Sequence, residues 1–88
     1  MANHKSATKQ HRQDERRRVR NRYNRSRMRT AVKKFRKALS EGDLDGATRL
    51  LAPTLALVDR TAKLGAIRTG TADRTKSRLA RALGRAAA

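Results

Sequence analysis

The fold is decided by residues 28–44, which read MRTAVKKFRKALSEGDL. The apolar residues of this stretch fall on one face of an α-helix, and they are Met28, Ala31, Val32, Phe35, Ala38 and Leu39. The helix should end at Gly42, because glycine readily adopts the left-handed conformation that follows a helix C-terminus. Asp43 can then accept hydrogen bonds from the free N–H groups of a new helix. The stretch therefore predicts a tight helical hairpin.

A second helix is expected after Asp43, with apolar residues in two rows. The main row contains Leu44, Ala47, Leu51, Leu55, Val58 and Ala62, and the flanking row contains Leu50, Leu57 and Leu64. Two apolar rows imply two neighbouring elements. Pro53 should bend or divide this helix, because proline lacks an N–H group and crowds the carbonyl four residues before it.

Residues 65–70 form the second expected connection, and Thr71 is a suitable N-cap for a third helix. The inward face of this helix would contain Ala72, Thr75 or Lys76, Leu79, and Ala82 or Leu83. No strand pattern is present. The predicted fold class is therefore all-α, a three-helix bundle with an overlong, basic N-terminal first helix.

The first helix can extend far N-terminal to the hairpin, because no glycine or proline precedes Gly42. A helix from Ser6 to Leu39 would span roughly 50 Å, so part of it must project from so small a domain. We therefore divide the single domain, residues 1–88, into a basic arm (residues 1–27) and a bundle (residues 28–85). Like charges four residues apart oppose helix formation, and we expect the free arm to be largely disordered.

Positive charge is concentrated in the first part of the chain. Residues 1–37 hold fifteen of the 24 Lys and Arg residues and two acids, which is a net charge of +13. Residues 38–62 have a net charge of −2 and residues 63–88 one of +6, so that the whole chain carries +17. A field of this size favours a polyanionic partner, and nucleic-acid phosphate is the most abundant one.

Aromatic residues limit the kind of nucleic acid. The chain has only Tyr23 and Phe35, whereas proteins that bind single strands stack several bases on aromatic rings. Phe35 belongs to the apolar face and is expected in the core, while Tyr23 could either pack locally or contact the ligand. Double-stranded or folded RNA, or DNA, remains as the partner, and the arginine-rich arm should read its backbone and shape.

Catalytic and metal sites have little support. Asp14 and Glu15 are adjacent and would point about 100° apart on a helix, and both histidines, His4 and His11, lie in the arm. His11 and Glu15 alone offer too few ligands for a metal, and the chain has no cysteine. We expect no enzyme activity, no cofactor, no metal and no small-molecule substrate.

The N-terminus shows no apolar segment of a secretion signal, and the chain has no apolar run of bilayer length. Organellar transit peptides are also rich in arginine, but they are usually amphipathic, whereas residues 5–27 are not. We expect a cytoplasmic protein without a membrane partner.

Short motifs occur in a specific order along nearly the whole chain. In the first half they are Met1-Ala2-Asn3, Lys5-Ser6-Ala7, Lys9, Asn21, Arg25-Ser26, Met28-Arg29-Thr30 and Lys33-Lys34, and the turn Glu41-Gly42-Asp43 and Val58-Asp59-Arg60 follow. In the second half they are Gly65, Ile67, Ala72, Arg74, Lys76, Ser77, Arg78 and Leu79. In order and spacing these residues resemble the family of protein twenty of the bacterial small ribosomal subunit.

The resemblance implies a three-helix bundle that binds 16S ribosomal RNA (rRNA) directly and early in small-subunit assembly, at the bottom of the body. The implied partners are 16S rRNA and the small ribosomal subunit. Matched polar residues expected to face the RNA are Asn3, Lys5, Ser6, Lys9, Asn21, Arg25, Ser26, Arg29, Thr30, Lys33, Lys34, Arg74, Lys76, Ser77 and Arg78. Arg12, Arg16, Arg17 and Arg20 of the arm and Arg68 of the second connection complete the predicted RNA-binding set.

Four positions depart from the family pattern. Arg68 stands for a histidine and can keep a phosphate contact, whereas Gly70 stands for an asparagine and loses a side-chain hydrogen bond. Leu64 stands for a lysine. Asp73 stands for an alanine and puts an acid near the RNA or beside Arg74. The resemblance therefore says least about residues 68–73.

Two rival functions would also suit a basic chain. The first is a histone-like DNA-compacting protein, which would also be rich in arginine and alanine. A dimerisation surface would distinguish such a protein. A cationic membrane-surface helix needs a strong apolar face opposite its bases, which residues 5–27 lack.

Overall fold

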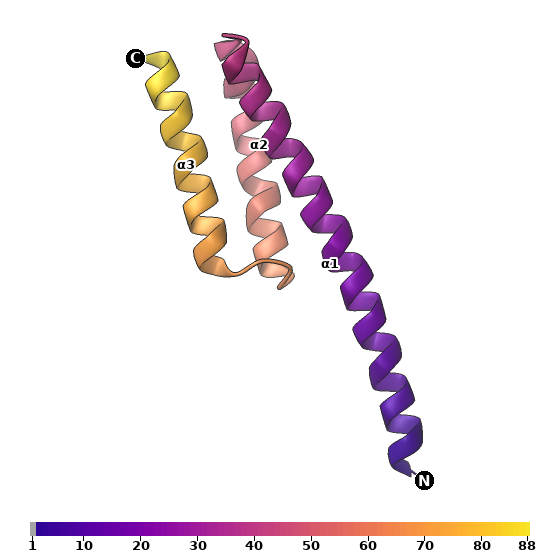
Figure 1. The fold of residues 1–88 in the computed structure, drawn as a ribbon. Coiled ribbons are helices and arrows are strands. Elements are labelled where there is room, and N and C mark those ends of the chain that lie inside the picture. Colours follow the sequence, from indigo (N-terminus) through magenta and orange to yellow (C-terminus); the bar gives the residue numbers. More distant parts are fainter. Residues whose placement is uncertain (1) are drawn as a thin grey trace.

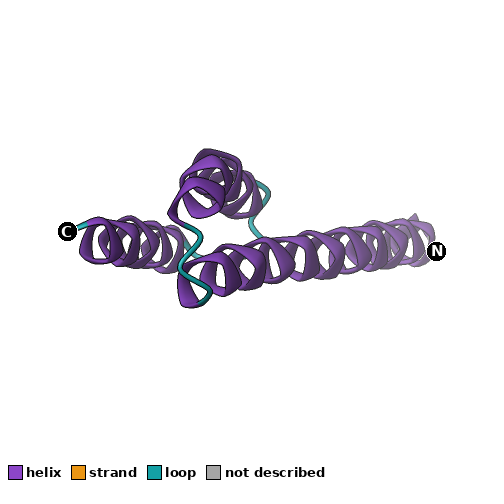
Figure 2. Ribbon diagram, turned by 90° about the horizontal axis from the view of Figure 1, so that it is seen from above, coloured by secondary structure: helices purple, strands orange, loops and turns teal. Residues whose placement is uncertain are grey.

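The computed structural model describes the backbone of residues 2–88 and the side chains of residues 7–88. Three helices, α1 (Ala2–Ser40), α2 (Leu44–Lys63) and α3 (Thr69–Ala87), account for nearly all of this part of the chain (Figure 1). Seen from above, α1 and α3 lie in one layer and α2 lies over the gap between them (Figure 2). Accordingly, α2 packs against both α1 and α3. The predicted all-α, three-helix architecture is confirmed.

Both connections begin with a glycine in the left-handed conformation, which the sequence predicts for Gly42. Gly42 and Gly65 have positive φ angles of 76° and 77°. The next N–H group, of Asp43 or Ala66, donates back to the carbonyl of Ala38 (2.9 Å) or Thr61 (3.0 Å), the long bond of a Schellman motif. These bonds turn the chain back sharply, so that successive helices run antiparallel.

The N-cap prediction is right for α2 and wrong for α3. Asp43 Oδ1 accepts a hydrogen bond from the N–H of Gly46 (2.9 Å), as expected. The third helix begins at Thr69, with Arg68 in extended conformation as its N-cap and no capping side-chain hydrogen bond. Thr71 lies inside the first turn, where its carbonyl accepts from Thr75 Oγ1 (2.9 Å). The extended backbone of Arg68 starts the helix before a capping side chain is reached.

Pro53 does not divide the second helix, which runs without interruption from Leu44 to Lys63. The residue is exposed, and so is Arg49, whose carbonyl loses its usual helical donor. Because this carbonyl lies on the solvent side, water can replace the missing hydrogen bond. Of the two expected effects of Pro53, the division of α2 is therefore not found, and a bend of the helix stays a prediction.

The core forms two clusters along the helices. One contains Phe35, Ala38, Ala47 and Leu79, and the other contains Met28, Val58 and Ala72. All seven come from the predicted apolar rows, and Phe35 is fully buried as expected. Leu44 departs from its row, because it is 37% exposed at the start of α2.

Two threonines of α2 are buried, which the apolar rows did not indicate. The hydroxyl of Thr54 donates to the carbonyl of Leu50 (2.6 Å), and that of Thr61 donates to the carbonyl of Leu57 (2.7 Å). Since each hydroxyl is satisfied within its own helix, neither leaves an unpaired polar group in the core.

The arm continues α1 as a helix far past the other two helices (Figure 1). The whole molecule has principal extents of 65, 20 and 14 Å. Arginine, lysine, glutamine and alanine are strong helix formers, and the arm contains short-range links such as Gln10 Nε2 to Asp14 Oδ1 (3.4 Å) and Arg18 to Glu15. The structure thus shows the helical form of the arm, whereas its expected disorder without RNA stays a prediction.

Candidate nucleic-acid interface

The outer part of the arm exposes basic side chains around the whole helix. Those of the predicted RNA-binding set are Lys9, Arg12, Arg16, Arg17 and Arg20, and all are exposed, as are Arg18 and Arg22 on the opposite side of the helix. Asp14 and Glu15 are the only acids in residues 7–27. A polyanion could therefore approach this part of the chain from more than one side.

A second basic surface spans two helices over the bundle. On α1 it contains Arg29, Lys33 and Arg36, which follow one another at helical spacing on the side away from the core row. On α3 it contains Arg74, Arg78, Arg81 and Arg85, spaced by four, three and four residues. All seven side chains are exposed, and we call this surface the α1–α3 basic face.

The two halves of the α1–α3 basic face meet in a cleft. Arg36 of α1 lines this cleft together with Arg78, Arg81, Ala82 and Arg85 of α3. No acidic side chain lines it, and none of the four arginines forms an ion pair within the described residues. Four guanidinium groups thus face one cleft without a counter-charge. A phosphate backbone could supply this charge and accept paired hydrogen bonds from each planar fork.

The acidic residues gather elsewhere, on α2 and the turn before it. Glu41, Asp43, Asp45 and Asp59 are exposed, and the α2 layer lies on the other side of the bundle from the α1–α3 layer (Figure 2). Four of the seven acids thus lie on α2 and the turn before it, where Arg49, Arg60 and Lys63 leave this segment close to neutral.

Two arginines of the predicted RNA-binding set hold the α2–α3 connection. Arg25 Nη1 donates to the carbonyl of Ala66 (3.2 Å), and Arg20 Nη2 donates to that of Leu64 (3.4 Å). These bonds satisfy carbonyls at the end of α2 and fix the connection against α1. Each guanidinium keeps further donors that an RNA could use, but part of its role is structural.

Asparagines support the same contact. The buried side chain of Asn24, which the sequence analysis missed, donates from Nδ2 to the carbonyl of Arg20 (2.9 Å). Asn21, which the resemblance assigned to the RNA, is half-buried and leaves its Oδ1 without a hydrogen-bond partner. Contacts between α1 and the α2–α3 connection thus reach N-terminally to Arg20, whereas the division into arm and bundle at residue 28 stays a prediction.

Lys76 packs inward, although it belongs to the predicted RNA-binding set. Its Nζ lies 2.7 Å from Asp59 Oδ1 of α2 and 3.8 Å from Asp73 Oδ1. The hydrogen bond to Asp59 raises the pKa of Lys76, with partial burial opposing it and the charges of both aspartates adding to it. This lysine joins α2 to α3, and Asp73, one of the departures from the family pattern, contributes to its surroundings.

The other predicted residues with described side chains form no hydrogen bond or ion pair to another helix. Ser26, Thr30, Lys34, Arg68 and Ser77 are exposed, although the Thr30 hydroxyl donates to the carbonyl of Ser26 (3.0 Å). The side chains of Asn3, Lys5 and Ser6 lie outside the described residues.

Three arginines of the cleft were missed by the sequence analysis, namely Arg36, Arg81 and Arg85. The spacing of Arg74, Arg78, Arg81 and Arg85 could have revealed the last two, because it places all four on one side of a helix. No pattern in the sequence joins Arg36 to them, since their proximity depends on how α1 and α3 are placed.

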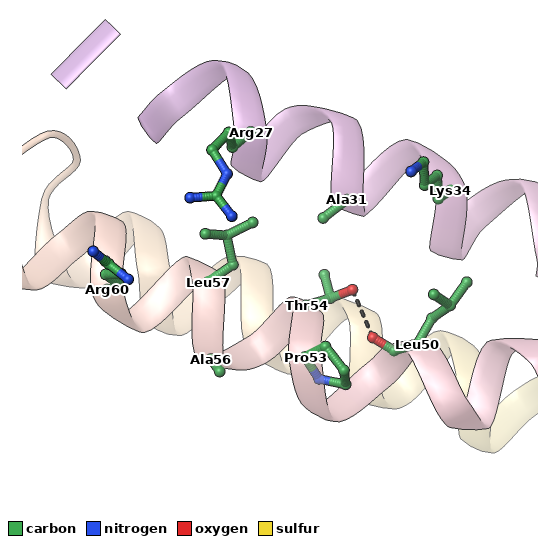
Figure 3. A pocket seen from close by; sticks show the side chains of 9 residues that line it. All are labelled: Arg27, Ala31, Lys34, Leu50, Pro53, Thr54, Ala56, Leu57 and Arg60. Atoms are coloured by element: carbon green, nitrogen blue, oxygen red, sulfur yellow. Dashed lines mark hydrogen bonds between the residues drawn. The ribbon is translucent and has the colours of Figure 1, made fainter. Parts of the chain in front are cut away.

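A groove on the other flank runs between α1 and α2 (Figure 3). Arg27 and Lys34 of α1 and Arg60 of α2 lie around it. Apolar side chains, Ala31, Leu50, Pro53, Ala56 and Leu57, make up most of the remaining lining, together with Thr54. Basic side chains thus border the bundle on this flank too.

The described part of the chain lacks two other kinds of feature. It contains no group of three or more His, Cys, Asp or Glu side chains that could hold a metal ion. None of its helices is long and apolar enough to cross a membrane.

Comparison with known proteins agrees with the motifs. The sequence model of the family Ribosomal protein S20 matches residues 2–84. A protein of Desulforapulum autotrophicum is 51% identical over 84 residues, which cover 96% of this chain and 100% of the relative. One of Thermomicrobium roseum is 48% identical over 79 residues, covering 90% and 80%, and one of Mycobacterium ulcerans is 46% identical over 83 residues, covering 94% and 95%.

All three relatives are named small ribosomal subunit protein bS20. The match spans the arm, the hairpin and most of α3, so it includes every described element that carries the basic surfaces. The resemblance that the motifs indicated is thereby confirmed, and the chain belongs to the ribosomal protein S20 family, a family of structural ribosomal proteins and not of enzymes.

Proposed function

We propose that this protein is a component of the small ribosomal subunit that binds 16S rRNA directly and supports assembly of the subunit in the cytoplasm. The observation that carries the proposal is the cleft of the α1–α3 basic face, where Arg36, Arg78, Arg81 and Arg85 converge without an acid. Arg36 belongs to the same helix as the projecting arm, and the exposed side chains of Arg29 and Lys33 lie between the arm and the cleft along α1.

Binding should read the RNA backbone and shape rather than its bases. Guanidinium forks bond phosphate oxygens in pairs, and folded RNA presents its phosphates and 2′-hydroxyl groups where side chains can reach them. The bundle fixes the spacing between α1 and α3, whereas the arm adds contacts along its length. In this arrangement α2 is the scaffold, because its packing places the two basic helices.

The salt dependence follows from the number of phosphate contacts. If about eight bases meet phosphates, the slope of log affinity against log salt should be on the order of −6 to −7. A slope shallower than about −3 would show that most of the basic side chains stay solvated in the complex.

A footprinting experiment tests the proposal. Purified protein is mixed with complete 16S rRNA, and the protected nucleotides are mapped at a salt concentration that abolishes its binding to duplex DNA. We expect protection of one defined fragment, since only a folded RNA matches the arrangement of arm and cleft. Uniform protection, or equal binding to DNA at every salt concentration, would contradict the proposal.

The rival function, DNA compaction by a dimer, receives no support from the exposed apolar residues. Within the described part of the chain, the exposed large apolar residues are Val19, Tyr23 and Leu44. Two of them lie on the arm and one at the start of α2, so they form no single patch of the size that a stable dimer buries.

A further inference from the structure

The arm carries an apolar patch on its most charged section. Val19 and Tyr23, four residues apart on α1, are 66% and 60% exposed. Together with Glu15, Arg16 and Arg20 they line a shallow hollow on the surface of the helix. Neither residue belongs to a core cluster, so packing of the bundle does not explain them.

The ring of Tyr23 is covered on one face. The guanidinium carbon of Arg27, one turn further along α1, lies over the ring at 5.6 Å from its centroid, within the range of a cation–π contact. The large exposed fraction of Tyr23 leaves the rest of the ring accessible. Its hydroxyl forms no hydrogen bond within the described part of the chain.

We propose that Tyr23 stacks on one unpaired base of the bound RNA, an inference that rests on the proposed RNA-binding function. The occupant of this patch must suit a flat apolar surface and a mainly positive surrounding, because Arg16, Arg20 and Arg27 lie around it against the single acid Glu15, which pairs with Arg18. An unpaired nucleotide has both properties, because its base is a flat π-system and its phosphate is anionic.

Stacking of one base on Tyr23 does not require a platform of several aromatic side chains, which this chain lacks. One aromatic side chain can hold one base without reading its identity, since every base has a π-face. Arg27 holds the ring from the opposite face, so the ring loses less freedom when the base stacks. The contact would therefore add affinity at one looped or bulged nucleotide and leave the phosphate contacts unchanged.

Two substitutions separate stacking from general apolar contact. Affinity for the protected 16S rRNA fragment is measured over a range of salt concentrations for the wild-type protein, Tyr23→Phe and Tyr23→Leu. We expect Tyr23→Phe to bind within about twofold of wild type and Tyr23→Leu to bind about tenfold more weakly, because alanine substitution of stacking residues shows effects of this order. The slope against salt should stay the same in both. Leu44→Ala is the matched control, since it also removes an exposed large apolar side chain but lies outside the arm.

A second readout observes the ring itself. The chain has one tyrosine, so selective isotopic labelling of tyrosine gives a single set of ring NMR signals. Stacking on a base should shift these signals upfield when the RNA fragment is added. An unshifted ring, wild-type affinity of Tyr23→Leu, or a loss that comes with a shallower salt slope would each overturn the inference. Failure of the wild-type protein to bind any 16S rRNA fragment would instead overturn the proposed function.

Discussion

The arm and the bundle use the same helical geometry for different purposes. In the bundle, the periodic apolar faces of the helices pack together, and Phe35 of α1 and Leu79 of α3 are fully buried. In the outer arm every described side chain from residue 7 to residue 20 is exposed except Glu15, so this section makes little tertiary contact beyond the hydrogen bond of Arg20 to the carbonyl of Leu64. The bundle can thus be stabilised by burial, whereas the arm depends on local helix propensity and on its partner.

This contrast teaches that stability and RNA binding are assigned to different side chains, even within one helix. Met28, Phe35 and Ala38 of α1 face the core, while Arg29, Lys33 and Arg36, between and beside them, are exposed. A substitution should therefore change either unfolding or salt dependence, depending on the face of α1 that it alters.

The largest effect is expected from Phe35→Ala. This substitution removes a fully buried aromatic ring and should lower the free energy of unfolding by about 3–5 kcal/mol, measured by urea denaturation. Val19→Ala, on the exposed arm, is the control and should change it by less than about 0.5 kcal/mol. Excess RNA should restore binding by Phe35→Ala through mass action, with an unchanged salt slope.

A double variant, Arg78→Ala with Arg81→Ala, should keep its stability and change its salt dependence. Both side chains are exposed in the cleft, so stability should change little, while the slope of log affinity against log salt should become shallower by about two. Arg49→Ala, which removes an exposed arginine from α2, should leave the slope unchanged. If Arg49→Ala had the same effect as the double variant, the division between basic face and scaffold would be wrong.

Helix content of the arm gives a smaller signal. Because like charges oppose the helix until phosphates neutralise them, circular dichroism should show more helix after the 16S rRNA fragment is added than in free protein. A truncated protein that begins at residue 20 should show little increase. Unchanged helix content, together with slow amide exchange in the free arm, would show that the helix of the structure persists without RNA.

The smallest effect concerns alkaline pH. The contact with Asp59 raises the pKa of Lys76 above its ordinary value of 10.5, so this pair stabilises the fold below the unfolded pKa. The contribution should be lost as pH rises through the folded pKa. Stability measured between about pH 8 and pH 12 should therefore fall more for wild type than for Lys76→Gln. Equal curves would show that the pair adds nothing to the fold.

Local sequence features were sufficient to predict most of the fold. Helical periodicity identified seven buried core residues, and Gly42 and Asp43 identified the hairpin, because each of these signals acts within one turn of the chain. The start of α3 was predicted wrongly, and Pro53 does not divide α2, which was one of its two expected effects. The start of α3 depended on the extended backbone of Arg68, and the continuity of α2 depended on the exposure of Pro53 to water. Neither outcome followed from the presence of a capping or helix-breaking residue.

By itself, the sequence determined three helices, the charge of each segment and family membership, since these depend on residue order alone. Only the tertiary structure decided how individual basic side chains are used. It tied Arg20 and Arg25 to the α2–α3 connection and Lys76 to Asp59, and it brought Arg36 beside the arginines of α3. The physical reason is that a charge in the sequence has no fixed neighbour until the helices pack. The distances between side chains of different helices then determine which charges are satisfied internally and which remain for a partner.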